Sequence, residues 1–343
     1  MDASRTYFLV NDTRFDNHFG GLSVIRNLAA GLSARGWHCT GSLPVSACAS
    51  HLRHQRRAVR AARYVVVNGE GSLHHNSRNT QRILGICQSL APTHKLVLLN
   101  AVWQDNDPVV WRPLLETFAV IYTRDRRSQE QLRSMGIDAQ YAPDLTFYDY
   151  PTFPDLPRKG YLCTDSVLSA WTDAALLLRK NTREIDVIPL FTKSLRYRRG
   201  SKDWHKVFKY QLYPLLDRRL GVRVPPRYRS LAYAMDDISV LLQKIASCQA
   251  ICTARYHALC FALQQGVPFV AVASNSHKSE SLLEEVGLVP GQHMIEQGDI
   301  ANLAAKLRGA EDGYASIAPD IVAFSQMAKV RLEKMFDDVA GIA

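Results

Sequence analysis

Short apolar runs alternate with stretches of helical periodicity along the first half of the chain. The first run covers 6–12, and within 22–32 apolar residues recur at three- and four-residue spacing, which is typical of a helix that packs by one face. Further apolar runs bounded by polar residues lie at 64–67, 95–103 and 118–122. Strands that alternate with helices in this way predict a parallel α/β sheet.

The same alternation returns in the second half, after a proline-rich stretch. Residues 148–160 contain three prolines and predict a crossover between domains. Segment 194–230 is basic and aromatic, and we expect it to include a loop near the active site. The chain is therefore expected to form an α/β protein with two Rossmann-like domains, 1–150 and 151–343, that face a central cleft, with a helix at the C-terminus.

Composition supports a soluble globular protein of two domains. The chain has 343 residues, of which 47% are hydrophobic and 22% charged, and this length suits two cores of ordinary size. No apolar run approaches the ~20 residues that span a bilayer, and the N-terminal apolar stretch is too short for a secretory signal. We expect a cytoplasmic location.

Cysteine usage agrees with a reducing compartment. The seven cysteines are odd in number and most lie in apolar segments, so buried free thiols are expected. Cys248, Cys252 and Cys260 lack the CxxC pairs of common zinc sites, and no metal is expected.

The formal net charge of +10 favours an acidic partner: a phosphate ligand, a nucleic acid or an anionic membrane surface. Arg53, Arg56, Arg60 and Arg63 share one face of a predicted helix. That face is either simply solvated or a contact for an anionic surface or substrate. Charge alone does not choose among these partners.

Ligands of open α/β sheets bind beyond the carboxyl ends of the strands, where the segment 69–75 follows the run VVVN. Its glycines permit tight turns and close approach of a ligand, and its backbone N–H groups suit an anion or a sugar oxygen. A simple turn with solvated histidines is the competing interpretation, because the segment is neither a Walker loop nor GxGxxG. The candidate residues are Gly69, Glu70, Gly71, Ser72, His74 and His75.

Two more strand ends carry charged residues. In the motif TRDRRS, the guanidinium groups of Arg124 and Arg127 match a carboxylate or a phosphate, and Arg124 lies nearest the strand end. Asp125 and Ser128 can instead cap the next helix. Asp144, in APDLTF, is either a carboxylate that organises its loop or a general base.

The stretch TARYHALC is the most informative. Arg255 and His257 lie where a strand turns into an apolar helix, and a helix N-terminus with an arginine favours an anion. His257 is then placed as an acid or base beside a bound phosphate, and Lys278 can add a point charge. Tyr256 and Trp103 suit sugar stacking and core packing equally.

Taken in order, these motifs resemble the polysaccharide pyruvyl transferase family. That family shows a glycine-rich loop after an early strand, then R-D-x-x-S followed by P-D, then an R-x-H-A helix start that leads to G-x-P and a lysine. The match covers most of residues 8–290. The matching positions are 69–71, 124–136, 143–144, 255–258, 266–268 and Lys278.

The resemblance implies a GT-B-like fold and transfer of the pyruvyl unit of phosphoenolpyruvate onto two hydroxyls of a sugar, giving a ketal. It places the acceptor on the N-terminal domain and the donor on the C-terminal domain, with no cofactor besides the donor substrate. By analogy, Arg124 and Arg255 hold the donor with support from Lys278, and His257 donates a proton. The candidates for the base are His75, His74, Glu70 and Asp144.

One departure from the family is visible in the first loop. Many relatives have three glycines and then an aspartate, whereas this chain has Glu70 within the loop and His75 near the place of the aspartate. A different acceptor, or a different reaction, would follow from that change.

Two rival functions stay open. A GT-B glycosyltransferase would hold a nucleotide-sugar diphosphate with the same arginines and lysine. A nucleic-acid-binding module is disfavoured, because no helix-turn-helix, zinc or RNA-recognition signature is present. For the pyruvyl transferase, the basic face at Arg53–Arg63 would bring the enzyme to a lipid-linked saccharide at the inner membrane face.

Overall fold

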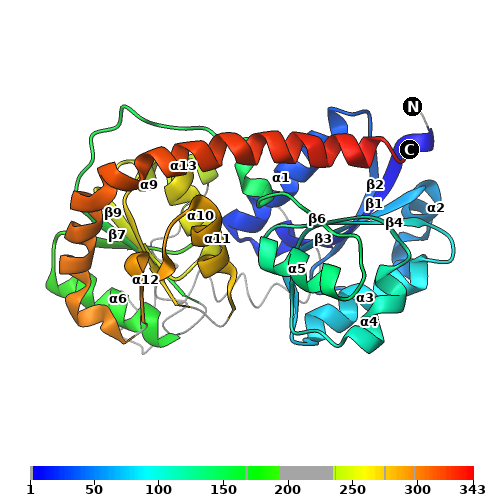
Figure 1. Cartoon of the computed structure of the whole chain (residues 1–343), viewed down its shortest axis with the longest axis horizontal. Coiled ribbons are helices and arrows are strands. Elements are labelled where there is room, and N and C mark those ends of the chain that lie inside the picture. Colours follow the sequence, from blue (N-terminus) through cyan, green and yellow to red (C-terminus); the bar gives the residue numbers. More distant parts are fainter. Residues whose placement is uncertain (1–2, 167–168, 193–234, 236, 274–275, 297) are drawn as a thin grey trace. The chain divides into compact units, whose positions relative to one another are not determined.

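The computed structural model describes residues 3–166, 169–192, 235, 237–273, 276–296 and 298–343. The expected loop in segment 194–230 lies outside these described residues. The chain forms two compact units (Figure 1). The first comprises residues 1–16, 21–149 and 326–343, and the second comprises 17–20 and 150–325.

The first unit is built on a six-stranded parallel sheet in the order β2-β1-β3-β4-β5-β6. The strands are β1 (Thr6–Asp12), β2 (His38–Pro44), β3 (Tyr64–His74), β4 (Lys95–Gln104), β5 (Phe118–Thr123) and β6 (Gln140–Tyr141). The helices between them are α1 (Phe19–Ser33), α2 (Arg56–Ala61), α3 (Arg78–Leu90), α4 (Pro108–Leu115) and α5 (Arg126–Ser134). The first two residues of α1 group with the second unit.

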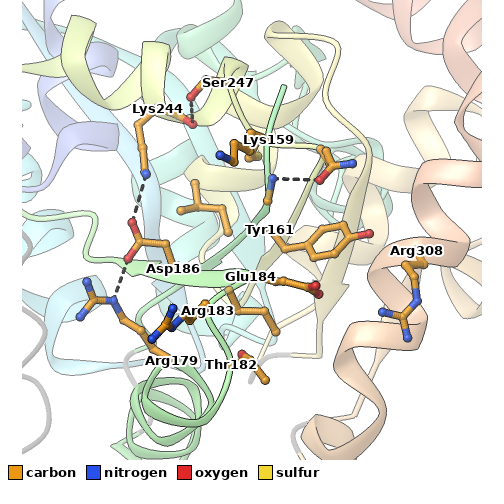
Figure 2. Close-up of a pocket in the computed structure, with 15 residues that line it drawn as sticks. Lys159, Tyr161, Arg179, Thr182, Arg183, Glu184, Asp186, Lys244, Ser247 and Arg308 are labelled. Carbon is orange, nitrogen blue, oxygen red and sulfur yellow. Dashed lines mark hydrogen bonds and ion pairs between the residues drawn. The ribbon is translucent and has the colours of Figure 1, made fainter. Parts of the chain in front are cut away.

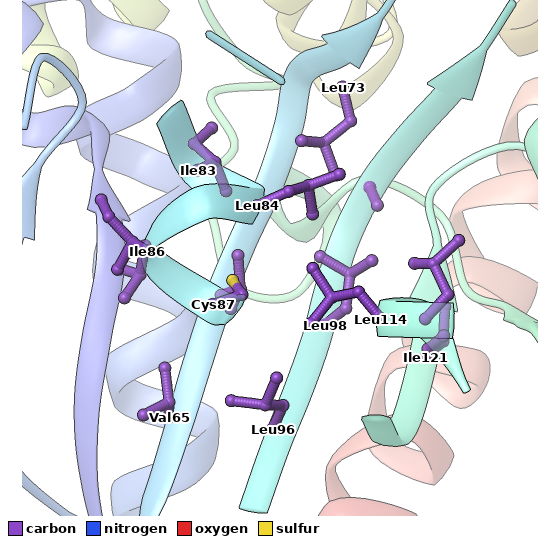
Figure 3. Close-up of a cluster of buried hydrophobic side chains, with 14 of the residues drawn as sticks. Val65, Leu73, Ile83, Leu84, Ile86, Cys87, Leu96, Leu98, Leu114 and Ile121 are labelled. Carbon is purple, nitrogen blue, oxygen red and sulfur yellow. The ribbon is translucent and has the colours of Figure 1, made fainter. Parts of the chain in front are cut away.

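The core of the first unit explains the long apolar runs of its central strands β3 and β4. Strands covered on both faces lose the alternation of polar and apolar residues, and residues 64–69 of β3 are all buried. Helix α3 adds Leu84 and Cys87 to the cluster that holds Val65 and Leu98 (Figure 3). Each such side chain contributes about 25 cal/mol per Å² of apolar area that it removes from water.

The second unit carries a five-stranded parallel sheet in the order β11-β10-β9-β7-β8. Its strands are β7 (Tyr161–Thr164), β8 (Ile185–Ile188), β9 (Ala250–Thr253), β10 (Phe269–Val272) and β11 (Met294–Ile295). Its helices are α6 (Ser169–Asn181), α9 (Ile238–Ala246), α10 (Tyr256–Gln264), α11 (Lys278–Val286), α12 (Pro290–His293) and the beginning of α13 (Leu303–Ala340). Two parallel sheets with interleaved helices confirm the predicted α/β class.

A short N-terminal piece, residues 17–20, pairs with the chain that follows β8. The Thr192 N–H donates to the Asn17 carbonyl and the Phe19 N–H donates to the Leu190 carbonyl, both over 2.9 Å. His18 and Phe191 form an antiparallel bridge between these bonds. The second unit therefore holds a histidine from the early part of the chain.

The segment 69–75, expected as a loop, is largely strand. β3 continues to His74, which pairs with Gln104 of β4, and a bulge lies between Glu70 and Leu73. A Cβ on Gly69 would lie 2.5 Å from the Ala101 Cβ, so this glycine is required for the close approach of β3 to β4. Among the described residues, no helix is both long and apolar enough to cross a membrane.

Candidate functional site

In the first unit, the asparagines Asn11, Asn68 and Asn100 lie at neighbouring register positions of the adjacent strands β1, β3 and β4. The Asn11 side chain donates to the Asn68 carbonyl over 2.6 Å, and the Asn100 side-chain oxygen accepts from the Leu145 N–H over 3.1 Å. Asn11 and Asn100 have φ values of 66° and 57°, which asparagine tolerates better than most residues. The sequence reasoning missed them, although an asparagine in or directly after each of three apolar runs was a readable signal.

Arg124 and Asp144 form a buried ion pair beside these asparagines. The Arg124 Nη1 lies 2.9 Å from the Asp144 Oδ2, and the side chains are 2% and 0% exposed. The other carboxylate oxygen of Asp144 accepts from the Thr146 N–H over 2.9 Å. Asp144 therefore organises its loop and neutralises Arg124. A buried pair of this kind is costly to break, by about 3–5 kcal/mol when one partner is removed.

Glu70 and Gly71 lie at the bulge of β3, near the same pair. The Asn68 side chain donates to the Glu70 Oε2 over 3.1 Å, and a Cβ on Gly71 would lie 3.4 Å from the Arg124 Nη2. Glu70 has a φ of 40°, an unusual value for glutamate that can indicate a functional position. The residue as a whole is only partly buried.

The other candidates of the first unit lie in separate surroundings. His75 is exposed and its Nδ1 lies 3.4 Å from the Asp105 Oδ2, while the His74 ring packs on it at 5.2 Å. Ser72 is buried, and its carbonyl accepts from Thr80. Arg127 lies in the first turn of α5, whose N-cap is Asp125, as the sequence allowed.

In the second unit, Asp165 directly follows β7 and forms hydrogen bonds to residues that follow β8 and β9. Its Oδ1 accepts from the Leu190 N–H over 3.1 Å. Both of its oxygens accept from Arg255, from Nε over 3.2 Å and from Nη2 over 2.5 Å. The guanidinium also lies over the Phe191 ring at 5.1 Å. Asp165 thus orients Arg255 with two hydrogen bonds. The sequence reasoning identified neither Asp165 nor this role.

His257 follows Arg255 in the first turn of α10 and is 7% exposed. Its ring lies 5.6 Å from the ring of His18 and 5.4 Å from that of Tyr256. A Cβ on Gly20 would lie 2.2 Å from the His257 ring, so only glycine leaves room for this histidine. Tyr256 is 7% exposed, which matches core packing.

The electrostatics of this cluster disfavour a further positive charge. Burial, and then the positive groups of Arg255, His257 and Lys278, hold the pKa of His18 well below its ordinary value of 6.5. Positive charges near enough to disfavour a second cation are near enough to attract an anion. Arg255, Tyr256 and His257 thus lie together at the beginning of α10, and Lys278 is the first residue of α11.

A cavity of about 900 Å³ lies at the opposite, amino edge of this sheet (Figure 2). Lys244 and Arg179 both pair with Asp186 there, over 3.0 and 2.8 Å. They lie in the last turns of α9 and α6, where basic residues complement the helix dipole. Arg183 and Arg308 also line this cavity. None of the predicted site residues belongs to it.

Comparison with known proteins identifies the family and the fold of this chain. The family model described as "Polysaccharide pyruvyl transferase" matches residues 43–276. Among curated proteins, no sequence matches this chain significantly.

Solved structures with a similar fold include a putative UDP-N-acetylglucosamine 2-epimerase from Listeria monocytogenes. It has 10% identity and a TM-score of 0.54, with 98% of this chain and 95% of that chain covered. The UDP-GlcNAc 2-epimerase of Neisseria meningitidis, bound to UDP-GlcNAc, has 10% identity and a TM-score of 0.52, with 97% and 99% covered. At this identity the likeness shows the fold alone, which is of the GT-B class.

Proposed function

This chain belongs to the polysaccharide pyruvyl transferase family, and we propose that it transfers the pyruvyl group of phosphoenolpyruvate onto two hydroxyls of a saccharide. It is thus a transferase by family. The observation that carries the donor assignment is the cationic cluster of the second unit. There Asp165 holds Arg255 through both carboxylate oxygens, the rings of His18 and His257 lie 5.6 Å apart, and, after burial, Arg255, His257 and Lys278 lower the pKa of His18.

Phosphoenolpyruvate suits this cluster because it carries about three negative charges in a small volume. Such a ligand is buried only against paired charges and hydrogen bonds. Asp165 takes two of the five N–H bonds of Arg255, which orients the guanidinium and leaves its remaining donors to a carboxylate or phosphate. Lys278 adds charge at the beginning of α11, where a helix N-terminus also favours an anion.

The proposed chemistry has two stages. His257 donates a proton to the methylene carbon of phosphoenolpyruvate, and the carbon that bears the phosphate gains oxocarbenium character. A first sugar hydroxyl attacks this carbon and loses its proton to a base. The second hydroxyl then displaces phosphate, which leaves with the remaining proton, and the ketal closes. Acid–base help of this kind contributes about 10²–10⁴ in rate.

Among the candidate bases, Glu70 has the most suitable surroundings. The carboxylate of Asp144 is committed to Arg124 and to the Thr146 N–H, and His75 lies beside Asp105 at the surface. We expect Glu70→Gln to lower kcat by about 10²-fold or more while the protein keeps its stability. Asp144→Asn is expected to lower stability by about 3–5 kcal/mol, because it leaves the buried Arg124 unpaired. Equal kcat for Glu70→Gln and wild type would remove Glu70 from this role.

The donor assignment is tested by calorimetric titration with phosphoenolpyruvate, run beside UDP- and GDP-sugars. We expect the wild type to bind phosphoenolpyruvate, and Arg255→Lys to bind it roughly tenfold or more weakly, because lysine keeps the charge but loses the bidentate geometry. Arg308→Lys, at the amino edge of the same sheet, is the matched control and should bind normally. Undiminished affinity in Arg255→Lys would reject this donor site.

The titrations with UDP- and GDP-sugars test the second candidate function, that of a glycosyltransferase. The Neisseria meningitidis protein of similar fold is described as bound to UDP-GlcNAc, and a diphosphate would suit the same arginine and lysine. Binding of a UDP- or GDP-sugar without phosphoenolpyruvate would make this chain a glycosyltransferase instead.

A peripheral contact with an anionic membrane completes the proposal. The stretch 46–63 has no acidic residue, and Arg53, Arg56, Arg57, Arg60 and Arg63 are all exposed. The apolar residues of this stretch pack inward against the core, so its surface is basic. Each arginine near an anionic surface contributes about 1 kcal/mol, which suits reversible binding to a membrane that carries a lipid-linked acceptor.

Co-sedimentation with vesicles of anionic lipid tests this contact. We expect the triple change Arg53→Glu, Arg56→Glu, Arg60→Glu to abolish sedimentation. The matched triple change Arg183→Glu, Lys306→Glu, Arg308→Glu, with the same change in net charge, should preserve it. Equal loss in both variants would show a nonspecific charge effect. Binding of RNA in preference to the vesicles would point to a nucleic acid.

A further inference from the structure

His18 has an unusual position for a residue so near the N-terminus. Its backbone is tied to Phe191 beyond β8, and its ring meets the Phe191 ring edge-on at 5.3 Å and 90°. The same phenyl ring lies under the guanidinium of Arg255. The structure thus places the His18 ring beside His257 and against the same phenyl ring that Arg255 covers.

The hydrogen bonds of His18 determine its tautomer. The Gly20 N–H donates to the His18 Nδ1 over 3.1 Å, so this nitrogen is the acceptor and the ring proton lies on Nε2. Burial lowers the pKa of the ring most, and the charged or titratable groups of Arg255, His257 and Lys278 lower it further. His18 is therefore a neutral imidazole with one N–H donor.

We propose that His18 binds the donor substrate, giving its Nε2–H to an anionic oxygen of the ligand held at Arg255. The identity of that ligand as phosphoenolpyruvate rests on the proposed function, whereas the role of His18 requires only an anion. A neutral donor contributes a hydrogen bond without adding another cation to Arg255 and Lys278. It also differs in role from His257, the proposed proton donor.

Nitrogen-15 NMR of the histidine side chains tests this directly on the wild-type protein. The His18 resonances are assigned by their loss in His18→Gln. We expect the Nε2–H tautomer throughout neutral pH, and a shift of the Nε2 resonance on titration with inorganic phosphate or with phosphoenolpyruvate. A protonated ring, or a resonance that neither anion moves, would overturn the proposal.

Substitutions give the second readout. His18→Leu removes the donor and is expected to raise the Kd and the KM for phosphoenolpyruvate roughly ten- to hundredfold, the range for a hydrogen bond to a charged group. His18→Gln keeps a neutral N–H donor and should recover most of that affinity. His293→Gln is the matched control, because His293 lies in the same unit and burial also lowers its pKa.

The outcomes separate this inference from the proposed function. A His18 shift with phosphate, combined with no binding of phosphoenolpyruvate, would reject the donor and keep His18 as an anion-binding residue. Binding of phosphoenolpyruvate with an unmoved His18 resonance would reject His18 alone. A loss of kcat in His18→Gln at unchanged KM would also reject it, because proton transfer and not binding would then be its role. The NMR measurement decides even where His18→Leu fails to fold.

Discussion

At the scale of single residues, Gly20 is the most sharply constrained position of the second unit's site. Alanine in a helix is ordinarily about 1 kcal/mol more favourable than glycine, so Gly20→Ala in the first turn of α1 would stabilise the protein if space allowed. Its Cβ would instead lie 2.2 Å from the His257 ring. We therefore expect a loss of activity and of stability together, measured as kcat and as the midpoint of urea unfolding.

A control for Gly20→Ala lies in the same molecule. A Cβ on Gly85, within α3, would have no other atom within 4 Å, so Gly85→Ala should raise stability and leave activity unchanged. A stabilised and fully active Gly20→Ala would show that His257 does not need the position that it occupies.

The residues that were predictable from the sequence are those attached to recognisable motifs. Arg255 and His257 follow a strand and begin a helix, and they lie together as expected. His18 and Asp165 were not identified, because each is a single polar residue whose partner is far along the chain. The pairing of 17–20 with 190–192 depends on a tertiary bridge, and no local pattern encodes it.

At the scale of elements, β3 shows why the glycine-rich segment was misplaced. Gly69 and Gly71 indicate a loop on local grounds, yet pairing with β4 continues through His74. The physical reason is packing, because Gly69 allows the two strands to approach at Ala101. The bulge then interrupts the ladder directly after Glu70, which still pairs with Ala101, and such bulges are common beside active sites.

This explanation of Gly69 predicts a rescue. Gly69→Ala would place its Cβ 2.5 Å from the Ala101 Cβ, and overpacking of this kind costs about 1–3 kcal/mol. The double variant Gly69→Ala, Ala101→Gly removes the opposing methyl group and should recover much of the loss. A double-mutant cycle of urea midpoints measures the coupling. Strict additivity would mean that the two positions do not meet.

At the scale of the whole molecule, the sequence predicted the class of fold well. Strand–helix alternation indicated the parallel α/β architecture in both halves, and the family model and the solved GT-B structures confirm it. The exact bounds of the units were less accessible. Residues 17–20 and 326–343 group with units from which they are distant in sequence. Such long-range packing produces no change of composition along the chain that would mark a domain boundary.

The histidines of the second unit also set how the stability of the whole protein depends on pH. The pKa values of His18 and His293 are lowered in the folded state, so the unfolded chain binds more protons as pH falls below about 6.5. Stability is thus fully present above that pH and decreases below it. Each histidine contributes at most about 1.4 kcal/mol per pH unit.

Asp186 and Asp338 produce a second decrease in stability, at more acidic pH. Their pKa values are lowered below 3.8 in the folded state, and the favourable partners are Arg179 and Lys244 for Asp186 and Lys334 and Tyr122 for Asp338. Urea midpoints measured as a function of pH should therefore fall in two stages. His18→Gln is expected to flatten the first stage and leave the second unchanged, since it removes one proton-binding difference between the folded and unfolded chains. An unaltered first stage in that variant would mean that His18 is protonated equally in the folded and unfolded states. That result would contradict the neutral His18 imidazole of the folded protein.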